Sequence, residues 1–182
     1  MSTLCIYIPI KFSIQIQGGD GMIYRIEKKA PIRIVGVRIP LTCDMDKNYK
    51  LISSFWEQIK QSGMFYEILN LNNTPQKKVF GISIYNEGDE VYYYIAATTD
   101  KPIPEGMYEY EIPESIWAVF ESRGPFKEST QTIYKRFFTE WLPFSEYRYT
   151  EIADVEVYPV YDEITVSGYA EIWMSIKKEN KS

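Results

Sequence analysis

The sequence predicts an α+β domain in which duplicated β-α-β-β units form one antiparallel sheet, with two helices on one face and a ligand cleft on the other. Two observations lead to this prediction. A strand–helix–strand–strand order occurs twice along the chain, and several strands carry large rings beside small residues on one of their faces. The length of 182 residues suits a single domain with a sizeable core.

The first unit starts with the nearly continuous β-branched run 32–39, which is typical of a strand covered on both faces. Apolar residues at helical spacing predict a helix over 44–61. A polar loop follows the helix. Strands are then predicted over 79–85 and 90–98, with the polar residues 86–89 forming the turn between them.

The second unit repeats this pattern without repeating the sequence. Strands are predicted over 107–112 and 115–122, and two closing strands over 154–158 and 169–176. A helix that ends at Pro143 is predicted between these pairs from apolar residues at i, i+3 and i+4 spacing: Ile133, Tyr134, Phe137, Phe138 and Trp141. The two predicted helices would pack on the same face of the sheet.

The composition excludes several kinds of chemistry. The chain has no histidine, so neither a Ser-His-Asp triad nor a His-ligated metal site is available. Cys5 and Cys43 are far apart and form no Cys-x-x-Cys pair, which favours a reducing, cytoplasmic location. No apolar run approaches the roughly 18 residues of a membrane span. No phosphate-binding glycine loop is present, and the net charge of −5 argues against nucleic acid. We expect no cofactor.

The first 21 residues have three interpretations. Alternating apolar residues at Phe12, Ile14 and Ile16 are typical of an extra edge strand. The second interpretation is a disordered extension, and the third is that Met22 is the true start of the protein. The main domain is predicted to span 22–178, with a short tail at 179–182.

One face of the strands has the composition of a binding pocket. Side chains alternate between the two faces of a strand. In four strands one set is apolar and would face the helices, while the other combines small residues, large rings and single carboxylates. The candidate ligand-binding residues in that second set are Ser83, Tyr92, Tyr94, Trp117, Val119, Tyr169, Glu171 and Trp173. They predict an aromatic-walled pocket. The alternative is that these rings cover an edge, a dimer interface or a second small core.

Four segments resemble motifs of one protein family, in the same order and spacing. Residues 112–120 with Gly124 resemble the family's Ile-Pro-x-x-x-Tyr-Ala-Val-Phe strand and following glycine, and 138–147 resemble its Trp-Leu-Pro-x-Ser-x-Tyr segment. Residues 155–158 and 171–176 resemble its Glu-x-Tyr and Glu-Ile-Trp-Ile-Pro-Ile segments. Over the predicted main domain, the chain is similar to the GyrI-like, AraC-type effector-binding domains of multidrug-sensing regulators.

The resemblance implies an aromatic-lined cleft between the two repeats, with a carboxylate that meets lipophilic cations. Glu171 matches the position of that carboxylate. Glu121 and Glu156 are weaker candidates, because their neighbours are less aromatic. Trp117 in place of the usual Tyr and Ser175 in place of the usual Pro leave the identity of the ligand open.

Two classes of function fit this resemblance. The first is a stand-alone effector- or drug-binding sensor without a catalytic residue, which takes a small hydrophobic or cationic ligand. Such a sensor would act through a regulatory protein partner, as a monomer or weak homodimer, without binding nucleic acid or membrane directly. The alternative is a hydrolase that opens strained cyclopropane-type electrophiles, with Glu171 as general base and Tyr94 orienting the substrate.

Overall fold

The computed structural model describes residues 16–17, 21–73, 76–87, 90–162, 165–166 and 168–179. Its strands are β1 (Ile16–Gln17), β2 (Ile23–Lys29), β3 (Ile32–Pro40), β4 (Lys78–Glu87), β5 (Glu90–Thr98), β6 (Tyr108–Ile112), β7 (Ser115–Arg123), β8 (Tyr147–Asp162), β9 (Thr165–Val166) and β10 (Tyr169–Lys178). Its helices are α1 (Met45–Gln61), α2 (Met64–Leu71) and α3 (Phe126–Arg136), followed by a π-helical turn (Phe137–Trp141) and a 3-10 turn (Leu142–Phe144).

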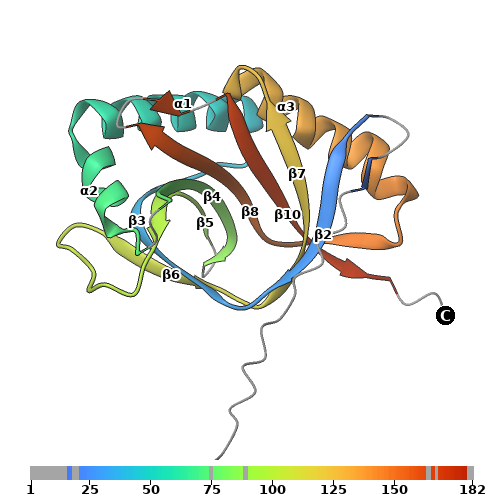
Figure 1. Cartoon of the computed structure of the whole chain (residues 1–182), viewed down its shortest axis with the longest axis horizontal. Coiled ribbons are helices and arrows are strands. Elements are labelled where there is room, and N and C mark those ends of the chain that lie inside the picture. Colours follow the sequence, from blue (N-terminus) through green and yellow to red (C-terminus); the bar gives the residue numbers. More distant parts are fainter. Residues whose placement is uncertain are drawn as a thin grey trace, which may run out of the picture.

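The strands form one antiparallel sheet with the order β1-β2-β7-β10-β8-β4-β5-β3-β6, and β9 pairs with β8. This order reflects the duplication. One repeat is β3-α1-β4-β5, the other is β7-α3-β8-β10, and they meet where β4 pairs with β8. The sheet curves strongly and is not closed, and α1 and α3 lie along the same side of it (Figure 1). The predicted α+β architecture is confirmed.

Strand β2 and helix α2 are not predicted from the sequence pattern, and neither is the two-residue strand β9. Strand β2 extends the sheet beyond β7. Helix α2 follows Gly63, whose φ of 80° lets the chain turn directly after α1. This helix is short, but half of its residues are buried: Phe65, Ile68, Leu69 and Leu71. Its packing, rather than its length, therefore keeps it helical.

The ends and turns of the sheet bear on three further expectations. Residues 16–17 pair with β2 at one end of the sheet, whereas Phe12 and Ile14 of the predicted edge strand lie outside the described residues. Residues 88–89 of the predicted turn also lie outside the described residues.

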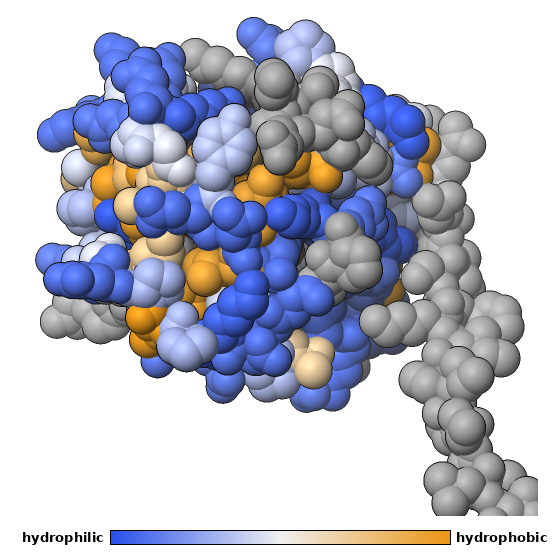
Figure 2. Space-filling view, turned by 60° about the vertical axis from the view of Figure 1, so that its left-hand side comes forward, coloured by the Kyte–Doolittle hydropathy of each residue, from blue (hydrophilic) through white to orange (hydrophobic). Residues whose placement is uncertain are grey.

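Within the described ranges, no helix has the length and apolar character needed to cross a bilayer. The space-filling view shows a largely hydrophilic surface with smaller apolar areas between the polar side chains (Figure 2).

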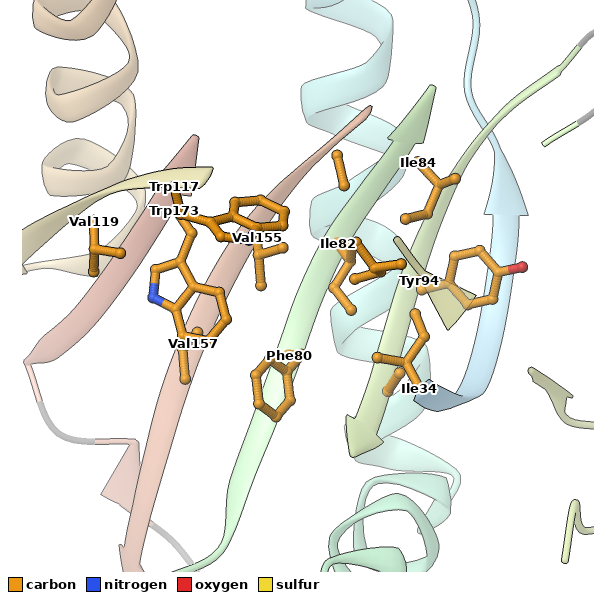
Figure 3. Close-up of a cluster of buried hydrophobic side chains, with 13 residues drawn as sticks. Ile34, Phe80, Ile82, Ile84, Tyr94, Trp117, Val119, Val155, Val157 and Trp173 are labelled. Atoms are coloured by element: carbon orange, nitrogen blue, oxygen red, sulfur yellow. The ribbon is translucent and has the colours of Figure 1, made fainter. Parts of the chain in front are cut away.

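Three hydrophobic cores hold the sheet and its helices together. One lies under α1 and α2, and a second lies under α3. The third, here called the strand-only core, contains side chains from strands and the bulge of β8 and none from helices. Figure 3 shows these side chains in front of the strands, with the helices behind. Both faces of the sheet are therefore covered.

A bulge interrupts β8 where it pairs with β10. Met174 pairs with Asp154, but Ile176 pairs with Tyr149, so a span of five residues in β8 faces a span of two in β10. The three extra residues are accommodated with Glu151 in the left-handed region, at a φ of 52°. Because the offset of five is odd, the bulge changes which side chains of β8 share a face.

Ser175 on β10 stabilises this bulge. Its buried hydroxyl accepts hydrogen bonds from the backbone amides of Ile152 and Ala153, at 3.2 and 3.4 Å. These amides lie in the bulge, where the regular strand pairing is interrupted. A buried amide without a hydrogen-bond acceptor would reduce the stability of the fold. The hydroxyl thus replaces the partner that the bulge removes.

Candidate functional site

A cavity of about 830 Å³ lies between α1 and α3, over strands β4, β5 and β8, and opens on the helix-bearing face. The sequence predicts a cleft on the opposite face. Aromatic rings line this cavity from both repeats: Tyr49, Trp56, Tyr85, Tyr93, Tyr134, Phe138, Tyr149 and Tyr158. Its acidic residues are Glu57, Glu151, Asp154 and Glu156. The volume is sufficient for a drug-sized molecule.

Glu156 lies on the floor of this cavity. Tyr93 and Tyr158 donate hydrogen bonds to its Oε2 atom, at 2.9 and 2.8 Å. Trp56 Nε1 donates to the Tyr93 hydroxyl at 2.9 Å, which orients that phenol toward the carboxylate. Burial raises the pKa of Glu156, while the two phenol donors oppose the shift. No described residue bonds Oε1 or forms an ion pair with this carboxylate.

Gly81 on β4 leaves room for this arrangement. It pairs with Glu156 across the boundary between the two repeats. A Cβ atom at this position would lie 2.2 Å from the Tyr93 hydroxyl oxygen and 2.8 Å from Glu156 Oε2. Both distances are well inside van der Waals contact, so any larger residue here would displace the phenol or the carboxylate.

Asp154 supplies a second carboxylate, which is buried and only 3% exposed. Tyr85 donates to its Oδ2 atom at 2.7 Å, and Tyr149 donates to Oδ1 at 2.9 Å. Burial raises the pKa of Asp154 to about 7; the two phenol bonds lower it, and the negative charges of Glu156 and Glu151 add to the rise. Burial and the Asp154 charge raise the pKa of both phenols, which therefore remain hydrogen-bond donors.

The rim of the cavity carries exposed apolar side chains beside charged ones. Phe138, in the π-helical turn after α3, is 45% exposed and packs edge-on against Tyr149, with ring centroids 5.3 Å apart. Met45 and Tyr49 of α1 are also exposed and line the cavity. π-helical turns occur often at functional sites. Here the turn directs Phe137 into the core and Phe138 to the rim.

Most of the predicted ligand-binding residues lie elsewhere, in the strand-only core. Tyr94, Trp117 and Val119 are completely buried there, and Trp173 is 8% exposed. The rings of Trp117 and Trp173 pack edge to face with centroids 6.1 Å apart (Figure 3). Tyr92 packs against the same cluster. The protein's own side chains thus fill the predicted hollow, as in the alternative interpretation of a second core.

Glu171 and Tyr169 lie beside that core and do not line the cavity. Arg25 donates to Glu171 Oε1 at 2.8 Å, and Trp173 Nε1 donates to Oε2 at 2.9 Å. The Tyr169 hydroxyl is 3.4 Å from Oε1. Arg25 also forms an ion pair with Glu27. The carboxylate that the family resemblance indicates therefore already has a cation from the protein itself.

The predicted face assignment of β4 is wrong. Its apolar residues Phe80, Ile82 and Ile84 are expected under the helices, but they lie in the strand-only core. Because both faces of this sheet are covered, apolar character does not indicate which face carries the helices. Ser83 consequently lies on the helix-bearing face, and among the predicted site residues it alone lines the cavity.

The sequence contains a signal for the carboxylates of the cavity. Asp154 and Glu156 alternate with apolar residues in the run Ala-Asp-Val-Glu-Val, so both acids share one face of a strand that is otherwise buried. Acids rarely occupy such positions without a functional or structural reason. The phenols that donate hydrogen bonds to these carboxylates come from distant segments and follow no local pattern.

The described residues contain no group of acids and cysteines arranged to hold a metal ion.

Solved structures of several proteins share this fold. A candidate bacterial transcription regulation protein from Staphylococcus aureus MU50 matches with a TM-score of 0.71 and 20% identity, over 86% of this chain and 99% of that one. SAV2435, in a structure bound to tetraphenylphosphonium, matches with a TM-score of 0.73 and 21% identity, over 85% and 93% of the two chains. The EcmrR C-terminal domain matches with a TM-score of 0.54 and 17% identity, over 87% and 99%. No curated protein sequence gives a significant match.

The duplicated fold with an aromatic cavity between its helices is that of a small-molecule-binding domain. The model of the GyrI-like small molecule binding domain matches residues 22–177. The chain belongs to this GyrI-like family, which confirms the resemblance seen in its sequence motifs.

Proposed function

We propose that the cavity between α1 and α3 is the effector site of this domain, and that it binds lipophilic cations anchored by Glu156. The observation that carries this proposal is a partly buried carboxylate whose Oε1 atom no described residue bonds. A charge that is partly withdrawn from water without a counter-ion is costly. A cationic ligand would recover much of that cost, whereas a neutral ligand would not.

The aromatic lining supports the same ligand class. Trp56, Tyr93 and Tyr158 surround the carboxylate, and a ring face contributes roughly 0.5–2 kcal/mol to a cation placed over it. The exposed apolar side chains of Met45, Tyr49 and Phe138 at the rim favour a ligand with a hydrophobic body. The similar structure of SAV2435 bound to tetraphenylphosphonium, a lipophilic cation, also supports this assignment.

We infer that the domain senses its ligand on behalf of a transcription regulator. The similar structures include a candidate transcription regulation protein and EcmrR in complex with DNA, where the match covers 57% of the EcmrR chain. The hydrolase alternative stays a prediction without support from the cavity. Its proposed general base, Glu171, lies outside the cavity and is paired with Arg25.

Titration with tetraphenylphosphonium by calorimetry tests the proposed site. Glu156→Gln should weaken binding by about 1–3 kcal/mol, because it removes the charged partner while keeping the size of the side chain. Glu171→Gln is the matched control and should leave the affinity unchanged. Triphenylphosphine oxide, which is neutral, should bind the wild type more weakly than the cation. Equal affinity of the wild type and Glu156→Gln would contradict the proposal.

A further inference from the structure

We propose that this cavity selects compact dications, with Glu156 holding one positive group and Asp154 the other. The inference rests on the proposed function, because both charges of the ligand would occupy the same cavity. It adds a second anchor and, with it, a defined distance between the two charges of the preferred ligand.

The spacing of the two acids defines that distance. Asp154 and Glu156 are alternate residues of β8, both line the cavity, and both lie beyond the bulge at Glu151. Alternate residues of a strand point to the same face and are about 6.5 Å apart. Two cationic groups about 7 Å apart could therefore each meet one carboxylate.

The protein itself does not neutralise these acids. Among the described residues neither Asp154 nor Glu156 forms an ion pair, and their hydrogen-bond donors are four phenols. Lys60 and Lys135 line the cavity, but both are exposed. Lys60 Nζ lies 5.9 Å from the ring centroid of Trp56 instead. Two carboxylates without a cation from the described protein thus share one cavity.

Each carboxylate retains capacity for a ligand. Glu156 accepts both of its phenol bonds at Oε2, which leaves Oε1 for a cationic group. Asp154 accepts one phenol bond at each oxygen, and a carboxylate oxygen has two lone pairs.

The cavity should select a dication because a monocation would leave one of the two carboxylates unpaired. A ligand with one charge pairs with Glu156 and displaces water from the cavity, so that Asp154 becomes a buried charge without a counter-ion. A ligand with two charges at the right spacing pairs both acids. The preference should therefore depend on Asp154, whereas binding as such should depend on Glu156.

A pair of permanently charged probes tests this inference. The dication is a para-xylylene ring carrying two trimethylammonium groups, whose nitrogens are about 7 Å apart, close to the spacing of alternate residues on a strand face. The monocation is the same ring with one trimethylammonium and one methyl group. At pH 8 the wild type should bind the dication at least about tenfold more tightly, as expected for one additional charged partner.

Three variants separate the roles of the acids. Asp154→Asn should abolish the tenfold preference without weakening monocation binding, because it removes the charge that a monocation leaves unpaired. Glu156→Gln should weaken both probes. Glu67→Gln, at an exposed position of α2 outside the cavity lining, should preserve the preference. Circular dichroism checks that each variant is folded. A fourth variant, Tyr85→Phe, removes one hydrogen-bond donor to Asp154 and should alter the affinity for the dication only.

The outcomes distinguish this inference from the proposed function. If neither probe binds the wild type, the proposed cationic effector site and the dication inference are both wrong. If the monocation binds but the dication shows no preference, or if the preference survives in Asp154→Asn, only the dication inference is overturned and the cationic effector site stands.

Discussion

The hydroxyl of Tyr149 lies 2.9 Å from Oδ1 of Asp154, although the two residues are five positions apart on the same strand. In a regular strand, residues an odd number apart point to opposite faces. The bulge around Glu151 is what brings both side chains to the cavity. The hydrogen bonding on the floor of the cavity therefore depends on the bulge in β8, and on Ser175 of β10, which stabilises that bulge.

Ser175→Ala should destabilise the protein and weaken ligand binding. Without the hydroxyl, the amides of Ile152 and Ala153 lose their acceptor, at a cost of about 1–3 kcal/mol. Denaturant unfolding measures this loss, and calorimetry with tetraphenylphosphonium measures the effect on the cavity. Ser122→Ala is the control, because that buried hydroxyl has no hydrogen-bond partner among the described residues. Similar losses in the two variants would show that the bulge does not need Ser175.

The stability of the protein should fall as the pH rises from 5 to 8. Asp154 has a folded pKa of about 7 against an ordinary value of 3.8, so the folded state keeps a proton that the unfolded state has released. Its contribution is fully present below about pH 4 and is lost as the pH rises through 7. Glu156, whose pKa is also raised, acts in the same direction.

Asp154→Asn should remove much of this pH dependence. At pH 8 the variant should be more stable than the wild type, by up to about 4 kcal/mol, since each pKa unit corresponds to about 1.4 kcal/mol. Urea unfolding at pH 5 and pH 8 measures the two slopes. Asp46→Asn, in the exposed first turn of α1, should keep the wild-type slope. Parallel slopes for wild type and Asp154→Asn would refute this assignment.

Gly81→Ala should abolish cation binding, because its Cβ would occupy the space between the Tyr93 phenol and Glu156. Overpacking of this kind also costs about 1–3 kcal/mol of stability. Gly168→Ala is the control, since its Cβ would meet the Gly124 carbonyl oxygen at an ordinary 3.4 Å. Calorimetry on both variants checks the prediction, and undiminished affinity in Gly81→Ala would argue against Glu156 as the anchor.

Glu171→Gln should reduce stability by about 1 kcal/mol, because it weakens the hydrogen bonds from Arg25 and Trp173. The loss is limited, since Arg25 keeps its ion pair with Glu27. Thermal unfolding measures the change. A large loss of tetraphenylphosphonium affinity with unchanged stability would instead favour a ligand-binding role for Glu171.

The architecture could be predicted because it is encoded locally. The β-branched run 32–39 and the helical spacing of Phe55 and Ile59 depend on near neighbours in the chain, and both elements form as expected. Helix α2 is too short for its periodicity to stand out. Its four buried side chains gain their stability from tertiary packing, which a sequence pattern does not show.

The position of the site could not be predicted in the same way. Periodicity correctly separates the two faces of a strand, but it does not say which face carries helices when both are covered. Trp117 and Trp173 therefore resemble a pocket lining in sequence, yet they pack into a core. The face shared by Tyr149 and Asp154 depends on the bulge, and the meeting of Tyr93 with Glu156 depends on the order of strands.

The junction between β4 and β8 has a consequence for cooperativity. In the described sheet, this strand pair provides the backbone hydrogen bonds that join one repeat to the other. A ligand bound between α1 and α3 would contact both repeats at once. Its binding free energy would stabilise the folded state, by roughly 2.7 kcal/mol at a ligand concentration a hundredfold above Kd. Occupancy would thereby tighten the coupling of the two halves, so that the melting temperature of the whole domain rises with ligand concentration.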